Sequence, residues 1–162
     1  MDYILGRMEA GLDQAAAIKE AQEQGYAEAD PSADIGGGDV RLKVAILANE
    51  LLGANLAAAD VPTEGITGIT AESIAEAAAQ GKRWKLIGRG ARQPDGSVTA
   101  QVASAMLDAD HSLAGVSGAT NAVAFDTKYL GRVTISGPGA GRTQTAYALL
   151  SDIIAMNAAA GA

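Results

Sequence analysis

The chain has 162 residues, enough for one ordinary domain, and 48% of them are apolar, which excludes wholesale disorder. The net charge of −7 argues against nucleic acid as a partner, because a polyanion binds to a basic surface. There is no cysteine for a disulfide, a thiolate metal site or a nucleophile, and no apolar run approaches the roughly 18 residues of a membrane span.

The first part of the chain is predicted to be helical. A short helix over 2–10 begins directly after the first methionine without an N-cap residue, which indicates a piece of a longer protein. The N-terminus lacks the layout of a signal peptide, and the absence of cysteine is compatible with a reducing compartment, so we expect a cytoplasmic protein. Asp13 is expected to cap a second helix that ends near Gln24, with Gly25 in a left-handed conformation after it.

A loop and two further helices are predicted next. Residues 26–38 contain a proline and three consecutive glycines, so we expect no regular element there. Residues 39–53 form a strong helical pattern, and Thr70 is expected to cap a helix that ends near Gly81. The apolar side of the 39–53 helix is predicted to consist of Val40, Val44, Leu47 and Leu51.

The second half of the chain changes to strand patterns. Residues 82–93 and 97–106 flank a Pro-Asp-Gly turn and predict a hairpin, and 121–127 and 131–136 predict a second pair. A helix from Thr143 to Met156 closes the chain, with 158–162 expected to be a frayed tail. This order predicts one α+β domain over 1–157, with a mixed, mainly antiparallel sheet and helices packed on one face.

The first candidate for chemistry is the pair Asp39 and Lys43. Residues four apart share a helix face, and an exposed pair of this kind is usually a surface ion pair of a few tenths of a kcal/mol. Here three glycines precede the helix and apolar residues flank Lys43. We therefore expect a partly desolvated lysine beside a carboxylate, which is a group suited to proton transfer.

The second candidate is the acidic cluster of Glu28, Asp30 and Asp34. Carboxylates this close repel each other unless a cation balances them. That cation can be a metal ion, the ammonium group of a substrate, or Lys43 and Arg41 of the chain itself. The alternative is a solvated acidic loop, and the spacing does not fit the twelve-residue calcium loop.

The third candidate is the glycine-rich segment 137–143, which leads into the last helix. Amides at a helix N-terminus can hold an anion, although a plain turn between strand and helix explains the glycines equally. The chain contains no G-x-G-x-x-G fingerprint and no nucleophile elbow. The single histidine, His111, is therefore expected to be a loop or packing residue.

The stretch from Ala21 to Lys43 closely resembles the signature of homoserine dehydrogenases. That signature has an Ala, three further residues, a Gly, an apolar and a small residue. It continues with an Asp-Pro and then an Asp, an aliphatic residue, a Gly and an Asp, with a Lys four positions later. In this chain its elements are Ala21, Gly25, Tyr26, Ala27, Asp30, Pro31, Asp34, Ile35, Gly37, Asp39 and Lys43. The segments EGITGIT, GVSGATNAV and GPGAGRTQTA are similar to family segments as well, so the resemblance covers nearly the whole chain.

This resemblance implies an enzyme that interconverts L-homoserine and L-aspartate 4-semialdehyde with NAD or NADP, in the biosynthesis of threonine and methionine. It implies that Lys43 transfers the proton with help from Asp39, and that Glu28, Asp34 and Asp39 bind the substrate. It also implies that the backbone meets the cofactor at Gly25 and Gly141. No metal site is expected in this chain, because the family's metal-binding loop lies upstream of this region.

One departure from the family concerns the whole protein. The nucleotide-binding domain of the family precedes this region and is missing from the chain, so we expect negligible turnover from the chain alone. The resemblance implies a homodimer, and the missing domain is an expected partner. The alternatives are a non-catalytic module that binds an amino acid and a purely structural dimerisation domain.

Overall fold

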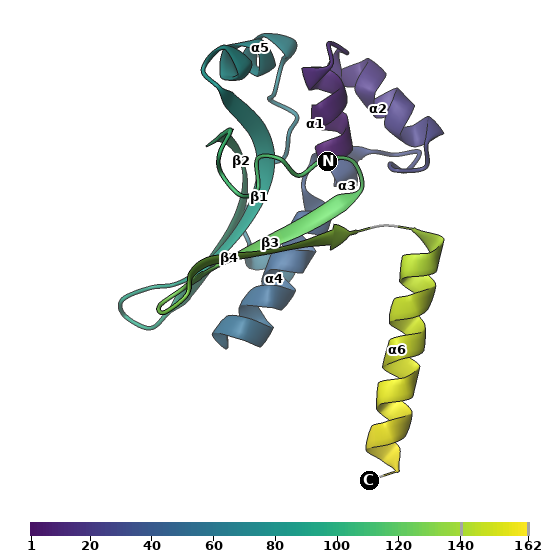
Figure 1. Cartoon of the computed structure of the whole chain (residues 1–162), viewed down its shortest axis with the longest axis vertical. Helices are drawn as coiled ribbons and strands as arrows, with labels where there is room; N and C mark the ends of the chain where they lie inside the picture. Colours follow the sequence, from purple (N-terminus) through teal and green to yellow (C-terminus); the bar gives the residue numbers. More distant parts are fainter. Residues whose placement is uncertain (140, 162) are drawn as a thin grey trace.

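The computed structural model describes residues 1–139 and 141–161, in which helices dominate the first half and two hairpins the second (Figure 1). The helices are α1 (Asp2–Glu9), α2 (Gln14–Glu23), α3 (Ser32–Ile35), α4 (Gly38–Leu52), the 3-10 turn η1 (Ala58–Asp60), α5 (Ala71–Ala79) and α6 (Arg142–Ala160). The strands are β1 (Lys82–Arg92), β2 (Val98–Asp108), β3 (Thr120–Thr127) and β4 (Gly131–Pro138). The predicted α+β class is confirmed.

The predicted helix caps explain where α2 and α5 begin. The Asp13 side chain accepts a hydrogen bond from the Ala16 amide at 2.7 Å. Thr70 forms a capping box with Ser73, because each side chain accepts a hydrogen bond from the other residue's amide. These bonds satisfy amides that have no partner inside the helix, so each helix starts at its cap.

The prediction that 26–38 contains no regular element is wrong, because α3 occupies Ser32–Ile35. The Asp30 carboxylate accepts a hydrogen bond from the Ser32 amide at 3.0 Å and so starts this single turn. The pKa of Asp30 is lowered by that backbone hydrogen bond. A turn of four residues is too short to produce a helical period in the sequence, which is why the pattern missed it.

The strands form two separate antiparallel hairpins rather than one continuous sheet. In β1–β2, Gly88 is opposite Val102, and in β3–β4, Val123 is opposite Ile135. The segment before α5 adds a short parallel bridge to β2: the Glu64 amide donates to the Val102 carbonyl, and the Val102 amide donates to the Pro62 carbonyl. This bridge makes the β structure mixed, as predicted.

Helix α4 lies very close to the β1–β2 hairpin. A Cβ atom at Gly88 would lie 2.9 Å from Cγ1 of Val40, whereas one at Gly90 would meet Cβ of Ala48 at an ordinary 3.5 Å. The buried residues of α4 are Val44, Ala45 and Ala48. The predicted apolar side of this helix holds for Val40, Val44 and Leu47, which are buried or half-buried, and is wrong for Leu51, which is 57% exposed. Alanines and two glycines let the helix approach the strand closely.

The last part of the chain is packed much less. No residue of β3, β4 or α6 is buried, whereas the core consists of residues between Ile4 and Ala114. Figure 1 shows α6 standing apart from the other helices. The helix runs to Ala160, past its predicted end at Met156, and part of the expected frayed tail, residue 162, lies outside the described residues. Within the described part of the chain, no helix has both the length and the apolar character needed to cross a bilayer.

Candidate functional site

Asp39 and Lys43 form an ion pair in the first turns of α4. The Lys43 Nζ donates to the Asp39 Oδ2 at 2.7 Å. Both side chains point away from the hairpin, because the buried face of the helix consists of Val44, Ala45 and Ala48 on the opposite side. The Lys43 side chain is 50% exposed, and the Asp39 side chain is 65% exposed. The expected partial desolvation of Lys43 is therefore absent in this chain, since its apolar neighbours face the core or, for Leu42, the solvent.

Glu28 and Asp34 are brought together by the loop that follows α2. The Glu28 amide donates to the Asp34 Oδ2 at 3.1 Å, and the Gln22 side chain donates to the carbonyls of Glu28 and Ala29. These bonds fix the backbone of the loop and leave the exposed Glu28 side chain outside them. Asp34 is half-buried and supports the loop, whereas the carboxylate of Glu28 is available to a ligand.

Lys43 and Arg41 do not balance the charge of the acidic cluster of Glu28, Asp30 and Asp34, which was one of the alternatives. In the described ranges, the ion pairs join neither Lys43 nor Arg41 to the acidic cluster. Lys43 instead pairs with Asp39, and the Arg41 Nε is buried on the other side of α4 without a hydrogen-bond partner. The same residues contain no group of three or more acidic, His or Cys side chains arranged to hold a metal ion.

The two glycines expected at a cofactor have exposed backbones. Gly25 follows α2 with φ of +73°, and no atom lies within 4 Å of the position that a Cβ would occupy. Gly141 precedes α6 with φ of +138°, and a Cβ there would collide with the side chain of Gln144. Gly25 is thus open to a ligand that approaches the main chain, whereas the space beside Gly141 is taken by the Gln144 side chain, and the two glycines are not a complete dinucleotide site.

The structure joins the predicted site residues into two pairs rather than one constellation. Asp39 bonds Lys43, and Asp34 bonds the backbone of Glu28. Within the described residues, no hydrogen bond or ion pair links one pair to the other. The site is an open surface along the start of α4.

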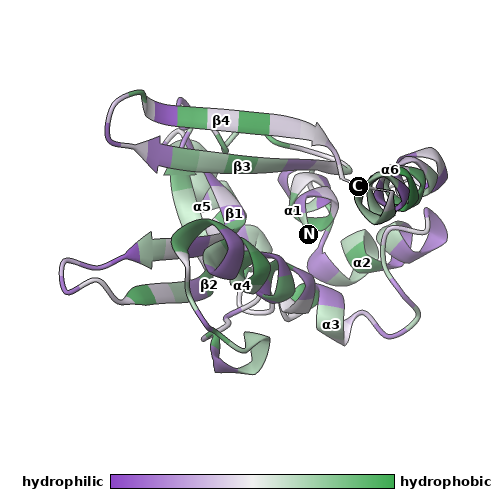
Figure 2. Ribbon diagram, turned by 90° about the horizontal axis from the view of Figure 1, so that it is seen from below, coloured by the Kyte–Doolittle hydropathy of each residue, from purple (hydrophilic) through white to green (hydrophobic). Residues whose placement is uncertain are grey.

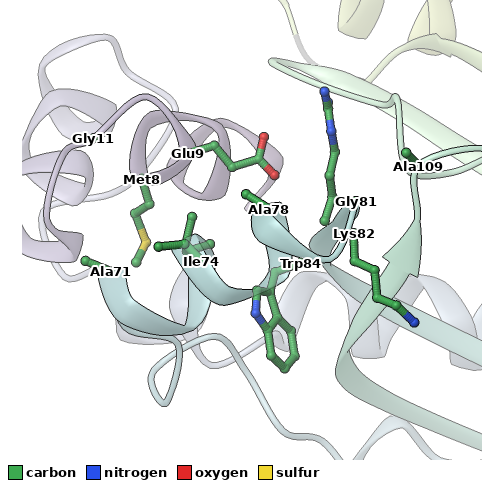
Figure 3. A pocket seen from close by; sticks show the side chains of 12 residues that line it. Met8, Glu9, Gly11, Ala71, Ile74, Ala78, Gly81, Lys82, Trp84 and Ala109 are labelled. Atoms are coloured by element: carbon green, nitrogen blue, oxygen red, sulfur yellow. The ribbon is translucent and has the colours of Figure 1, made fainter.

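A groove lies elsewhere on the molecule, among α1, α5 and the start of β1 (Figure 3). It has a volume of about 490 Å³ and is lined by residues that include Met8, Ile74 and Trp84. Trp84 donates from its indole to the Ser73 carbonyl at 3.0 Å and so packs against α5. None of the predicted site residues lines this groove.

The pattern reading missed one buried charge, Lys85, whose side chain is only 5% exposed. It lies in β1 between Trp84 and Leu86. A lysine is almost never fully buried unless it is paired, so the sequence alone gives no reason to expect this burial. His111 is a loop residue as expected: its Nδ1 accepts from the Leu113 amide at 3.2 Å, and its Nε2 lies 2.9 Å from Arg132.

Comparison with known proteins identifies the family. The family model described as homoserine dehydrogenase matches residues 1–154. The chain belongs to the homoserine dehydrogenase family. An NAD(+)-dependent homoserine dehydrogenase of Pseudomonas canavaninivorans is 56% identical over 153 residues, which are 94% of this chain and 44% of that protein.

Solved homoserine dehydrogenases share the fold. A crystal structure from S. aureus superposes with a TM-score of 0.91 at 32% identity and covers 99% of this chain and 41% of its own. A hyperthermophilic archaeal homoserine dehydrogenase in complex with NADPH has a TM-score of 0.72 at 30% identity, covering 94% of this chain and 43% of its own. The chain therefore spans less than half the length of these homoserine dehydrogenases, of which the Pseudomonas protein is named NAD(+)-dependent and the archaeal one was solved with NADPH.

Proposed function

We propose that the chain is the catalytic and substrate-binding part of a homoserine dehydrogenase, which interconverts L-homoserine and L-aspartate 4-semialdehyde in threonine and methionine biosynthesis. The observation that carries this proposal is the 2.7 Å Asp39–Lys43 pair at the start of α4, inside the segment that matches the family. The cytoplasm is its proposed location, and residues 1–157 its functional unit.

Lys43 is the proposed proton-transferring group. Oxidation of the homoserine hydroxyl requires that its proton leave as the hydride leaves carbon, and a neutral lysine amine can accept that proton. Asp39 accepts a hydrogen bond from Nζ, so it fixes the direction of the amine and balances the ammonium that forms. In the reverse reaction the same ammonium donates a proton to the aldehyde oxygen.

Glu28 is the proposed group for the substrate ammonium. Its carboxylate is exposed, while Gln22 and Asp34 hold the backbone on either side of it. A carboxylate on a fixed loop binds an ammonium without reordering the chain, which lowers the entropic cost of binding. Asp34 contributes by positioning Glu28, and Asp39 faces the same solvent side as Lys43.

Gly25 and Gly141 are the proposed backbone contacts to the cofactor. NAD or NADP, when bound, supplies the hydride acceptor. Neither glycine carries a side chain that blocks the approach of a ligand, and both have positive φ angles that favour glycine. The choice between the two cofactors belongs to a part of the protein outside this chain.

The outward faces of α4 and α6 are the proposed contacts to the missing nucleotide-binding domain. Leu42 and Ile46 flank Lys43 and are more than half exposed, and α6 exposes large apolar side chains along its length, Tyr147, Leu149, Leu150, Ile153, Ile154 and Met156. Covering these residues would remove apolar surface from water and desolvate Lys43 at the same time.

A second copy of the chain is the proposed partner of the β3–β4 hairpin. Val123 and Phe125 lie opposite Ile135 and Val133 and form one apolar face, and Ile135 is 63% exposed. The other face carries the Asp126–Arg132 ion pair and the Thr134–Ser112 hydrogen bond. An isolated two-stranded hairpin is marginally stable in water, so its apolar face requires a partner. Figure 2 shows this hairpin along one side of the molecule.

The proposed function is tested by reconstitution. The purified chain is mixed with the remaining portion of the Pseudomonas canavaninivorans relative, and homoserine-dependent reduction of NAD or NADP is followed by absorbance. We expect turnover from the mixture and none from either part. If the mixture forms a complex but does not turn over, the chain is a binding or dimerisation module.

A further inference from the structure

Lys85 is the buried charged residue of the described chain. Its Nζ donates to the carbonyl of Val116 and lies 3.6 Å from the Asp2 carboxylate, which is itself 27% exposed on its side chain. Burying an ammonium is costly, and a replacement by an apolar residue of similar volume is often neutral or stabilising. Overall stability therefore does not explain why Lys85 is buried, and its contribution lies in positioning the segments that it contacts.

The segment that Lys85 holds leads to the turn before α6. Val116 begins a short loop that ends at Ala119, and the Ala119 carbonyl accepts a hydrogen bond from the Gly139 amide at 2.8 Å. The Asn121 side chain fills the space beside Gly139, so a Cβ at that position would collide with it. The loop 116–119 is thus hydrogen-bonded to Gly139, which follows β4 and lies two residues before Gly141.

Asp2 links the same ammonium to the first residue of α1. Lys85 therefore joins three segments that are far apart in sequence: the start of α1, the strand β1 and the loop 116–119. Among the described residues, no other side-chain hydrogen bond or ion pair joins these three segments. One ammonium with three donors can satisfy several acceptors at once, which an apolar residue cannot do.

We propose that Lys85 is a positioning residue, which holds the loop 116–119 and, through the Ala119–Gly139 hydrogen bond, the backbone at Gly139 directly after β4. The role in cofactor binding rests on the proposed function, because Gly141, two residues further on, is the proposed cofactor contact. The role in holding Gly139 does not, since it concerns contacts within this chain alone.

Whether Lys85 holds Gly139 is tested on the chain itself, by backbone amide exchange measured with NMR. Lys85→Met should speed exchange of the Gly139 amide by about tenfold or more, while amides in α4 change by less than about twofold. Lys82→Met is the matched control, because Lys82 lies on the same strand but pairs with Asp108 at the surface, at 3.2 Å. It should leave Gly139 unchanged.

Two results would overturn the proposal. One is an unchanged Gly139 amide in a folded Lys85→Met chain, and the other is faster exchange throughout the chain, which indicates a general loss of stability. Lys85→Gln is measured in parallel, because its shorter amide does not reach the Val116 carbonyl and it should also release Gly139. If neither variant folds, Lys85 is a stability residue and the proposal is wrong.

The reconstituted enzyme then separates the two roles. Lys85→Met should raise the KM for the nicotinamide cofactor several-fold and leave the KM for homoserine unchanged, since Glu28 is far from Lys85 in the hydrogen-bond network. If the wild-type mixture has no activity, the proposed function fails. The exchange measurement still decides whether Lys85 holds Gly139.

Discussion

The helical part with the β1–β2 hairpin, residues 1–114, and the part formed by β3, β4 and α6 differ in how they are stabilised. The first contains every buried apolar residue of the described chain, including Leu5, Ile66 and Val102. The second contains none and exposes large apolar side chains on both the hairpin and the helix. The first part resembles a folded core, and the second resembles an interface whose partners lie outside the chain.

Because of this difference, we expect substitutions in different parts of the chain to change different measured quantities. Changes on the outward face of α4 should alter the rate, changes in the β3–β4 hairpin should alter assembly, and changes between α4 and β1 should alter stability.

The largest expected effect is on the rate. In the reconstituted enzyme, Lys43→Ala should lower kcat by about 10²–10⁴-fold, the range for the loss of a general acid–base group, with little change in melting temperature. Lys43→Arg should be nearly as damaging, because a guanidinium does not accept a proton near neutral pH. Lys19→Ala, at an exposed site on α2, is the control. Near-native kcat in Lys43→Ala would contradict the catalytic role.

Substrate affinity should show the next largest effect. Glu28→Gln removes the charge that faces the substrate ammonium and should weaken homoserine binding by about 10–100-fold, the range of 1.4–2.8 kcal/mol for a lost charged contact. Calorimetry or NMR titration on the reconstituted protein measures it. Asp13→Asn, which keeps a helix cap outside the site, is the control. Equal binding by Glu28→Gln and wild type would remove Glu28 from the site.

Assembly should respond to the apolar face of the β3–β4 hairpin. Ile135→Lys places a charge among Val123, Phe125 and Val133 and should raise the dimer dissociation constant by about tenfold or more. Ser136→Lys carries the same charge on the opposite face and should leave the dimer intact. Sedimentation at several protein concentrations distinguishes them. A wild-type chain that is monomeric at tens of micromolar, roughly the range of moderate dimers, would reject the proposed dimer.

Stability should respond to the contact between α4 and β1. Gly88→Ala places a Cβ 2.9 Å from Cγ1 of Val40 and should cost about 1–3 kcal/mol of unfolding free energy through overpacking. That loss corresponds to a melting temperature lower by several degrees, about 2–4 °C per kcal/mol for a domain of this size. Gly90→Ala, whose Cβ has ordinary contacts, should be neutral. Equal melting temperatures for the two variants would show that the helix moves freely away from the strand.

The smallest expected effect is on the acid sensitivity of the first part. The hydroxyl of Tyr3 and then the guanidinium of Arg7 lower the pKa of Glu20 by hydrogen bonding to its carboxylate. A lowered pKa means that the carboxylate stabilises the fold above its ordinary pKa near 4.5, and that this contribution is lost as the pH falls through the lowered value.

Glu20→Gln should therefore be less stable than wild type near neutral pH, and the difference should vanish in acid. Melting temperatures measured from pH 6 to about pH 3 test it, the range over which carboxylates titrate. Glu23→Gln, at an exposed position on the same helix, is the control. A difference between Glu20→Gln and wild type that persists unchanged in acid would show that the carboxylate charge is not its cause.

The sequence predicted the parts of the fold that depend on local signals. The caps at Asp13 and Thr70 and the turn at Gly96 defined the helix starts and the first hairpin, because each signal acts over a few residues. The buried face of α4 was predicted at Val40 and Val44, which face Gly88, but it was missed at Ala48, because that contact depends on Gly90 in a strand that is distant in sequence. No pattern within the helix contains that information.

In the candidate site, too, the contact fixed by helix geometry was predictable, and contacts that depend on a loop or on distant residues were not. The Asp39–Lys43 pair was predictable because four residues on a helix fix the geometry. The bond from the Glu28 amide to Asp34 depends on the conformation of a loop with an unforeseen turn, α3, and the exposure of Lys43 depends on which face of α4 packs against β1. Lys85 was missed because its partners, Asp2 and Val116, are distant in sequence.

The thin layer between α4 and β1 limits how this protein can be engineered for heat resistance. Larger core side chains are a common way to raise a melting temperature. At Gly88 a larger side chain would push the helix from the strand and displace Asp39 and Lys43, because both belong to the same helix. The same spacing therefore affects both heat resistance and the position of the proposed catalytic pair, and thermostabilising substitutions are better placed at the groove between α1 and α5.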